Sequence, residues 1–283
     1  MDGTTRAPAR RIVLGIPIDA FTMTQAVGQC TDALENDGYL SIGVVNAAKV
    51  MAMRRDPRLM KAVSGCHLIT ADGQSVVWAS RLVRAPLPER VAGIDLFEEL
   101  LAEAERRKDS VYFLGARPEI LARMLDEVAR RFPGLPVAGA RDGYFGAGDE
   151  AEIAADIRRS GARLLFVGIS SPKKELFLDQ WGEATGASVV HGVGGSFDIM
   201  AGLTRRAPRW YQKLGLEWLY RVRQEPLRLG RRYLTTNVSF LALLAVEMLK
   251  AYTRGRTTPA YAPPPMADAG AGSAPASTSG DRL

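Results

Sequence analysis

Asp72 is the residue of this sequence best suited to proton transfer. It follows the apolar, strand-like run 67–71 and is followed at once by Gly73 and a helix-like pattern. An Asp-Gly pair of this kind usually provides a helix N-cap and a turn. The chemical alternative is that a carboxylate at the tip of a buried strand accepts the proton of a bound hydroxyl group. The dipeptide alone leaves both interpretations open.

Small and polar residues also follow the other predicted strands. The residues that share this position are Asn46, Ser170, Ser171, Gly194, Gly195 and Asp198. Ligands of open α/β sheets bind at the carboxyl ends of the strands, so these residues together with Asp72 predict a nucleotide cleft with a general base. The run "GVGGS" resembles a phosphate-binding loop, although an isolated glycine-rich run is more often a tight turn.

Several other kinds of site are not expected from the sequence. It contains no Walker A motif, no GxSxG elbow and only two cysteines, which form no cluster with histidine. We therefore expect no metal site and no cofactor. His67 and His191 are interpreted as hydrogen-bonded core residues, because neither has a second ligand at metal-binding spacing. A Rossmann oxidoreductase is disfavoured, since the first predicted βα turn lacks GxGxxG.

Strand-like and helix-like segments alternate from about residue 11 to 202. Thr22 with Gln25 predicts a capping box, and Asp56-Pro57 predicts another helix start. The run 11–18 is predicted to be one strand. Strands alternating with helices of ten or more residues predict an α/β domain with a mostly parallel sheet.

The composition changes after this domain. Residues 203–252 are rich in arginine and aromatic side chains and are predicted to form a helical appendage, broken or kinked at Pro226. Residues 1–10 and the Pro/Ala/Gly/Ser-rich residues 253–283 are predicted to be disordered.

The arginines of the appendage suit an anionic partner. Arg221, Arg228 and Arg232 are spaced to share one helix face with Arg231 at its edge, and arginine forks fit diphosphate oxygens. Aromatic neighbours and the apolar run 238–249 suit an anionic membrane surface. A solvated basic surface is the structural alternative, and no nucleic-acid motif is present.

The overall composition is that of a globular protein. The chain has 283 residues, 47% of them hydrophobic, and a formal net charge of +6. No secretory signal is recognised, and no apolar run reaches the roughly 18–20 residues that a membrane span needs. We expect a cytoplasmic protein.

Motifs along most of the chain resemble one family. They occur in the family's order over about residues 12–240: "NAAKV", "ADGQSVVWASR", "PERVAGIDLFEELL", "LLFVGISSPKKE", "HGVGGSFDIMAGLTRRAPRW" and "LGLEWLYRVRQEPLRLGRRYL". Together these runs are similar to the WecG/TagA/CpsF family of bacterial glycosyltransferases.

The resemblance implies a Rossmann-like core and an activity. It implies inverting transfer of a hexose or N-acetylhexosamine, such as N-acetylmannosamine, from a UDP-sugar to a polyprenyl-diphosphate-linked sugar. The setting would be cell-surface polysaccharide synthesis at the inner face of the membrane, with the appendage bound peripherally and a homo-oligomer possible.

The resemblance also implies roles for single residues. Asp72 matches the proposed general base, while Asn46 and Arg90 match residues of the substrate pocket. Arg221, Arg228 and Arg231 match arginines proposed to hold the diphosphate. Lys174, Gly194, Gly195 and Asp198 are the further candidates for substrate binding.

Two positions depart from the family pattern. Lys174 stands where the family usually has a glutamine, and Val44 stands where it often has a threonine. Both changes bear on donor recognition and leave the base and the arginines unchanged. The alternative is a protein that binds a nucleotide or a lipid diphosphate in the same cleft without catalysing a reaction, as a subunit of a polysaccharide assembly complex. Retention of Asp72 and Asn46 counts against it.

Overall fold

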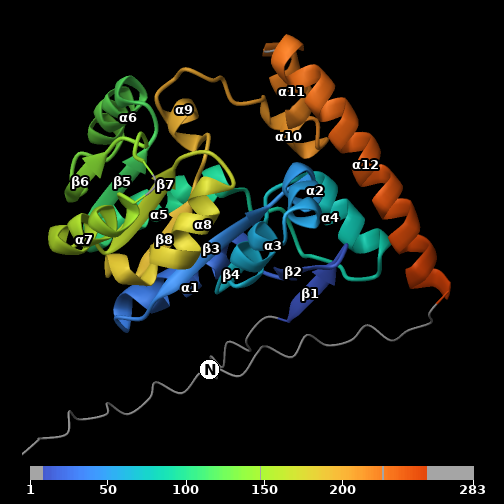
Figure 1. Cartoon of the computed structure of the whole chain (residues 1–283), viewed down its shortest axis with the longest axis horizontal. Coiled ribbons are helices and arrows are strands. Elements are labelled where there is room, and N and C mark those ends of the chain that lie inside the picture. Colours follow the sequence, from blue (N-terminus) through green and yellow to red (C-terminus); the bar gives the residue numbers. More distant parts are fainter. Residues whose placement is uncertain (1–8, 147, 225, 254–283) are drawn as a thin grey trace, which may run out of the picture.

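A computed structural model describes residues 9–146, 148–224 and 226–253 of the chain (Figure 1). Its centre is a six-stranded sheet in the order β4–β3–β8–β7–β5–β6, in which every neighbouring pair is parallel. The strands are β3 (Leu40–Val45), β4 (Leu68–Ala71), β5 (Val111–Gly115), β6 (Val137–Arg141), β7 (Leu164–Gly168) and β8 (Val189–Gly192). The predicted α/β class with a parallel sheet is confirmed.

Helices connect the strands and cover both faces of the sheet. They are α1 (Met23–Glu35), α2 (Ala47–Arg55), α3 (Pro57–Ser64), α4 (Gln74–Leu82), α5 (Gly93–Arg107), α6 (Pro118–Arg131), α7 (Glu150–Ser160), α8 (Lys173–Trp181), the 3₁₀ turn Glu183–Thr185 and α9 (Ser196–Met200). Alternate strand residues enter different cores. Phe113 of β5 packs in the core shared with α1, α5 and α6, and Leu114 packs in the core shared with α7 and α8.

The start of the described chain differs from the sequence prediction. The run predicted as one strand forms an antiparallel hairpin of β1 (Arg10–Val13) and β2 (Ile16–Asp19) outside the main sheet. The turn requires positive φ at Leu14 (54°) and Gly15 (82°), a conformation that leucine rarely adopts. The residue types therefore gave no hairpin signal.

Local signals for helix ends are confirmed. The Thr22 hydroxyl accepts a hydrogen bond from the Gln25 N–H, and the Gln25 side chain accepts one from the Thr22 N–H. The Asp56 carboxylate accepts from two N–H groups of α3, whose first residue is Pro57. The break predicted at Pro226 falls between two helices, since α12 begins at that residue.

Three helices form the C-terminal segment: α10 (Arg209–Lys213), α11 (Glu217–Gln224) and α12 (Pro226–Thr253). Figure 1 shows α12 running along one side of the molecule past α2. Phe240 and Leu244 of α12 are buried in a third apolar cluster, which we call the hairpin-side cluster. Besides these two, it contains Val13, Leu14, Ile16, Ile18, Val45, Val50, Met53, Leu59, Val63, Ile69, Ala71, Val76, Val77, Ala79, Ala85 and Leu87. Within the described ranges, no helix is long and apolar enough to cross a membrane.

The predicted disordered termini lie mostly outside the described residues. At the N-terminal side, Ala9 and Arg10 are described, and Arg10 already belongs to β1, where it pairs with Asp19 at 2.7 Å. At the C-terminal side, the description ends with Thr253, the last residue of α12.

Candidate active site

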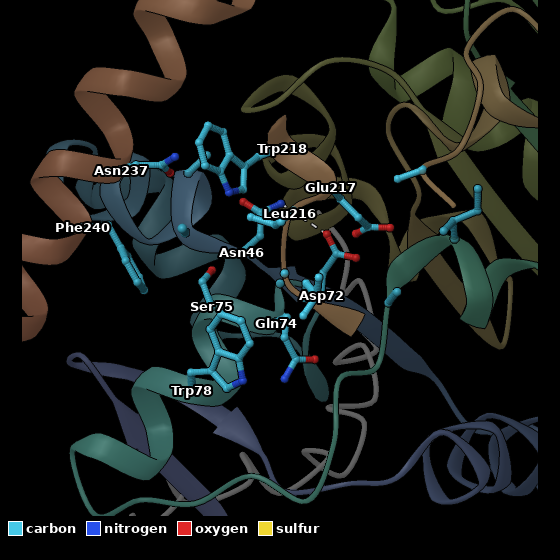
Figure 2. A pocket seen from close by; sticks show the side chains of 18 of the residues that line it. Asn46, Asp72, Gln74, Ser75, Trp78, Leu216, Glu217, Trp218, Asn237 and Phe240 are labelled. Atoms are coloured by element: carbon cyan, nitrogen blue, oxygen red, sulfur yellow. Dashed lines mark hydrogen bonds between the residues drawn. The ribbon is translucent and has the colours of Figure 1, made fainter. Parts of the chain in front are cut away.

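Asp72 and Asn46 meet at the carboxyl end of the sheet. Val45 and Ala71 are paired in the register of β3 and β4, so the residues that follow them lie side by side. The Asn46 Nδ2 group donates to Asp72 Oδ2 at 3.3 Å, and the Asn46 Oδ1 accepts from the Lys49 N–H as the N-cap of α2 (Figure 2). The Asn46 side chain thus orients the Asp72 carboxylate, and its own orientation is set by its hydrogen bond to the first turn of α2.

The Asp72 carboxylate does not cap the helix that follows it. The N-cap of α4 is Gly73, and no side chain caps that helix end. Asp72 Oδ1 instead accepts from the N–H of Gly93, the first residue of α5, at 3.1 Å. A carboxylate can accept further hydrogen bonds beyond these two, so the group is held firmly and still has lone pairs for a substrate hydroxyl.

His191 contacts the residue whose N–H group binds Asp72, namely Gly93. Its Nε2 lies 3.1 Å from the carbonyl oxygen of Gly93, to which it donates when that nitrogen carries the proton. The side chain is fully buried, and burial lowers its pKa to about 4. The imidazole is therefore neutral at pH 7, as expected for a hydrogen-bonded core residue. His67 is hydrogen-bonded through Nδ1 to the hydroxyl of Ser41 at 2.9 Å, but the residue is exposed. Its prediction as a core residue is therefore wrong, because it lies just before the buried strand β4.

Asp72 and Asn46 line a cavity of about 480 Å³ between the sheet edge and the C-terminal helices. This volume falls within the range typical of small-molecule sites. The polar end carries Asp72, Asn46 and Glu217, and Figure 2 shows these side chains around the same space. Much of the remaining wall is apolar and comes from α4, the α10–α11 region and α12: Trp78, Leu82, Leu214, Leu216, Trp218, Phe240, Leu241 and Leu244.

Lys174 lies in a second polar group at the same edge of the sheet. It stands in the first turn of α8, and its ammonium group is 3.3 Å from Glu175 Oε1. The same oxygen accepts from the ammonium of Lys49, which also donates to the Ser171 hydroxyl at 2.7 Å. We call Lys49, Ser171, Lys174 and Glu175 the lysine cluster.

The glycine-rich turn follows β8. Gly194 has φ +53°, and a Cβ atom there would lie 3.0 Å from Lys174 Nζ, so the turn and the lysine cluster are in contact. Gly195 precedes the short helix α9. Asp198 lies in α9, where its backbone carbonyl accepts from the N–H groups of Leu203 and Thr204. Neither glycine nor Asp198 lines the 480 Å³ cavity.

Arg90 connects the core to the C-terminal segment. Its guanidinium donates to Glu217 Oε2 at 2.6 Å and to Gln212 Oε1 at 3.2 Å. It also lies 3.6 Å from Asp95, which receives a bidentate pair from Arg206 at 2.5 and 2.8 Å. Arg90 is thus near the cavity and is engaged in ion pairs.

Arg221 lies in α11, and Arg228 and Arg231 lie in α12. The side chains of these three arginines are outside the described part of the structure, so their predicted role stays a prediction.

Cys30 and Cys66 carry thiols rather than a disulfide, and burial raises the pKa of both to about 12. Among the described residues, no group of three or more His, Cys, Asp or Glu side chains is placed to hold a metal ion.

Comparison with known proteins places the chain among glycosyl transferases. The model of the glycosyl transferase WecG/TagA/CpsF family matches residues 11–254. The chain belongs to this family. A relative from Bacillus spizizenii, an N-acetylglucosaminyldiphosphoundecaprenol N-acetyl-beta-D-mannosaminyltransferase, is 36% identical over 197 residues, which are 70% of this chain and 76% of the relative. The WecG/TagA/CpsF resemblance noted from the motifs is therefore confirmed.

Sequence reasoning missed several contributors to this WecG/TagA/CpsF site. Lys49 and Glu175 form a partly buried ion pair although they are 126 positions apart. Gly93 and His191 support Asp72 from two further segments. Each lies inside a motif that carries the family resemblance, but spacing along the chain gives no sign that they meet.

Proposed function

We propose that this protein transfers a sugar, with inversion, from a UDP-sugar to a sugar linked to a polyprenyl diphosphate, and that Asp72 is the general base. The observation that carries the proposal is the pair Asp72–Asn46, joined at 3.3 Å on the wall of the cavity. The name of the Bacillus spizizenii relative, which specifies a lipid-diphosphate-linked acceptor, supports the acceptor class.

In the proposed reaction, one bond to the anomeric carbon forms while another breaks. The acceptor hydroxyl oxygen attacks the anomeric carbon from the face opposite UDP, and its proton passes to the Asp72 carboxylate. The bond between the anomeric carbon and the UDP oxygen breaks, and UDP leaves with the electron pair. The contacts to Asn46 and Gly93 hold the carboxylate in place for this transfer.

The developing negative charge on the diphosphate requires cations. We propose Arg221, Arg228 and Arg231 for this role, because guanidinium groups form bidentate contacts with phosphate oxygens. The helices that carry them, α11 and α12, adjoin the cavity through Trp218 and Phe240.

We further propose that the C-terminal segment binds an anionic membrane surface at the cytoplasmic side. The outward side of α12 supports this, because Val238, Val246 and Leu249 are exposed on the side opposite the buried Phe240 and Leu244. Together with the arginines of α11 and α12, such an apolar stripe is typical of interfacial helices.

The test is UDP release by the purified full chain. A panel of UDP-sugars is assayed with a short-chain polyprenyl-diphosphate-sugar acceptor, using wild type, Asp72→Asn and, as a matched control, Asp32→Asn on the exposed side of α1. Acceptor-dependent release with one donor is expected in wild type and in the control. In Asp72→Asn, release should fall by about 10²–10⁴ with the fold intact.

Two outcomes would contradict the proposal. Full activity of Asp72→Asn would remove this residue as the base. UDP binding without release, for every donor and acceptor, would favour the binding subunit over the enzyme.

A further inference from the structure

The lysine cluster carries more positive than negative charge in a largely buried place. Only 10% of the Lys49 side chain, 14% of Lys174 and 11% of Glu175 is exposed. Two ammonium groups therefore share one carboxylate, which leaves one excess positive charge. A buried charge without full compensation is costly in free energy, so such an arrangement favours binding of an anion.

The two lysines are not held equally. Lys49 has a hydrogen bond to Ser171 and one to Glu175, and it also lies in the helix that Asn46 caps. In the described part of the chain, the ionic contact of Lys174 is the one to the oxygen that Lys49 already occupies, at 3.3 Å. Lys174 is thus the cation whose charge is left for a ligand.

The ionisation of the cluster agrees with this geometry. Burial and the neighbouring Lys174 lower the pKa of Lys49. Burial alone would raise the pKa of Glu175, but Lys174 and Lys49 bring it below its usual value. Glu175 therefore stays ionised, and the lowered pKa of Lys49 reflects its burial together with the excess positive charge that the two ammonium groups share.

The cluster lies where a ligand of the sheet is expected. Lys49 follows β3, Lys174 follows β7, and the Gly194 turn follows β8, which lies between those two strands. The carboxyl ends of these three neighbouring strands form one stretch of the sheet edge, and ligands of open α/β sheets bind outside the carboxyl ends of the strands. Asn46, which touches Asp72, is the N-cap of the helix that holds Lys49, so this helix connects the lysine cluster to the wall of the cavity, which the cluster itself does not line.

We propose that Lys174, backed by Lys49 and the Gly194 turn, forms an anion subsite that binds a negatively charged group of the sugar donor beside Asp72. The inference rests on the proposed function and deepens it by naming the donor chemistry. The bound group is a phosphate of the diphosphate or a carboxylate on the sugar, since both present anionic oxygens to an ammonium group.

The variant Lys174→Gln tests the subsite without breaking the ion pair. It removes the excess charge and leaves Lys49 paired with Glu175, so the fold should be retained. Lys173→Gln is the matched control: it makes the same charge change one residue away, where the ammonium donates to the Phe145 carbonyl at 2.8 Å.

Binding is measured by titration calorimetry with UDP, UDP-glucose, UDP-glucuronate and inorganic diphosphate, on wild type and both variants. We expect Lys174→Gln to weaken at least one class of ligand tenfold or more, with Lys173→Gln unchanged. Parallel weakening of UDP, UDP-glucose and diphosphate would identify the diphosphate as the bound group. Weakening of UDP-glucuronate alone would identify a sugar carboxylate.

The remaining outcomes separate the two proposals. If Lys174→Gln binds all four ligands like wild type, the anion subsite is refuted, while the transferase proposal stands on the UDP-release assay. If diphosphate binding depends on Lys174 but no nucleotide binds, the subsite stands and the UDP-sugar donor is refuted. If wild type binds none of the ligands, both are refuted.

Discussion

The Asp72 carboxylate is held from two different segments, by the Asn46 amide and by the Gly93 N–H. Its place at a strand end next to Asn46 follows from the parallel register of β3 and β4, which the alternation of strands and helices already implied. The contact with Gly93 depends on the loop before α5, in which the Val91 N–H donates to the Ala71 carbonyl at 3.0 Å, and this pairing has no signature in residue spacing.

His191 leads to a prediction about acid stability. Its pKa is about 4 in the folded protein and about 6.5 in an unfolded chain, so unfolding takes up a proton between these values. The stability that the neutral imidazole contributes is full above pH 6.5 and is lost as the pH falls towards 4. We expect this histidine to lower the free energy of unfolding by about 2–3 kcal/mol between pH 7 and pH 4.

Urea unfolding of wild type and His191→Gln at pH 7 and pH 4 measures this contribution. Glutamine can still donate to the Gly93 carbonyl but does not titrate, so the acid-dependent loss should be smaller by that amount. Equal losses in both proteins would show that the histidine is not responsible.

At the scale of helices and strands, the sequence predicted the alternation of strands and helices and two helix starts, but it did not predict the hairpin. Caps and proline positions marked the helix ends because they act through neighbouring residues. Strand order was not predictable in the same way. β8 enters the sheet between β3 and β7, and only this insertion brings Lys49, Lys174 and the Gly194 turn together.

The attachment of α10 and α11 to the core leads to a second prediction. Asp95→Asn removes the charge that receives both hydrogen bonds from Arg206. Since both side chains are partly exposed and the amide keeps one acceptor oxygen, we expect a cost of about 1.5 kcal/mol, the lower limit for one bond to a charged group. We expect the segment from residue 203 to 224 to open about tenfold more often, and limited proteolysis within it to accelerate accordingly.

The control for this experiment is Glu119→Gln. That carboxylate lies 4.0 Å from Arg117, and both side chains are well exposed, so the pair contributes little. Proteolysis of the control should match wild type. An unchanged rate in Asp95→Asn would mean that the ion pairs do not hold the segment closed.

At the scale of the whole molecule, the exposed apolar residues of α12 can be substituted without changing the residues of α12 that are buried. We expect Val238→Glu with Leu249→Glu to reduce binding to anionic vesicles at least tenfold, since each apolar side chain contributes about 1.5–3 kcal/mol on burial. Vesicle co-sedimentation measures this, with Val137→Glu at the exposed face of β6 as control. Binding that survives in the double variant would place the membrane contact elsewhere.

Deleting residues from 203 onward is a less specific test of the same contact. The sequence predicts an appendage that begins near this residue, because the composition changes there. Packing shows otherwise, since Phe240 and Leu244 are buried in the hairpin-side cluster together with residues of α2 and α4. A truncated protein would lose part of a core as well as a surface.

The hairpin-side cluster also bears on how the protein is made. It joins Val13 near the beginning of the described chain to Leu244 near its end. At a synthesis rate of about 5–20 residues per second, roughly 10–50 s separate the appearance of these two residues. During that interval the apolar side of the hairpin and of α2 has no α12 to cover it. Helix α12 therefore completes a core whose other members are synthesised earlier. A ribosome that stalls before α12 leaves a nascent chain with this core exposed to solvent.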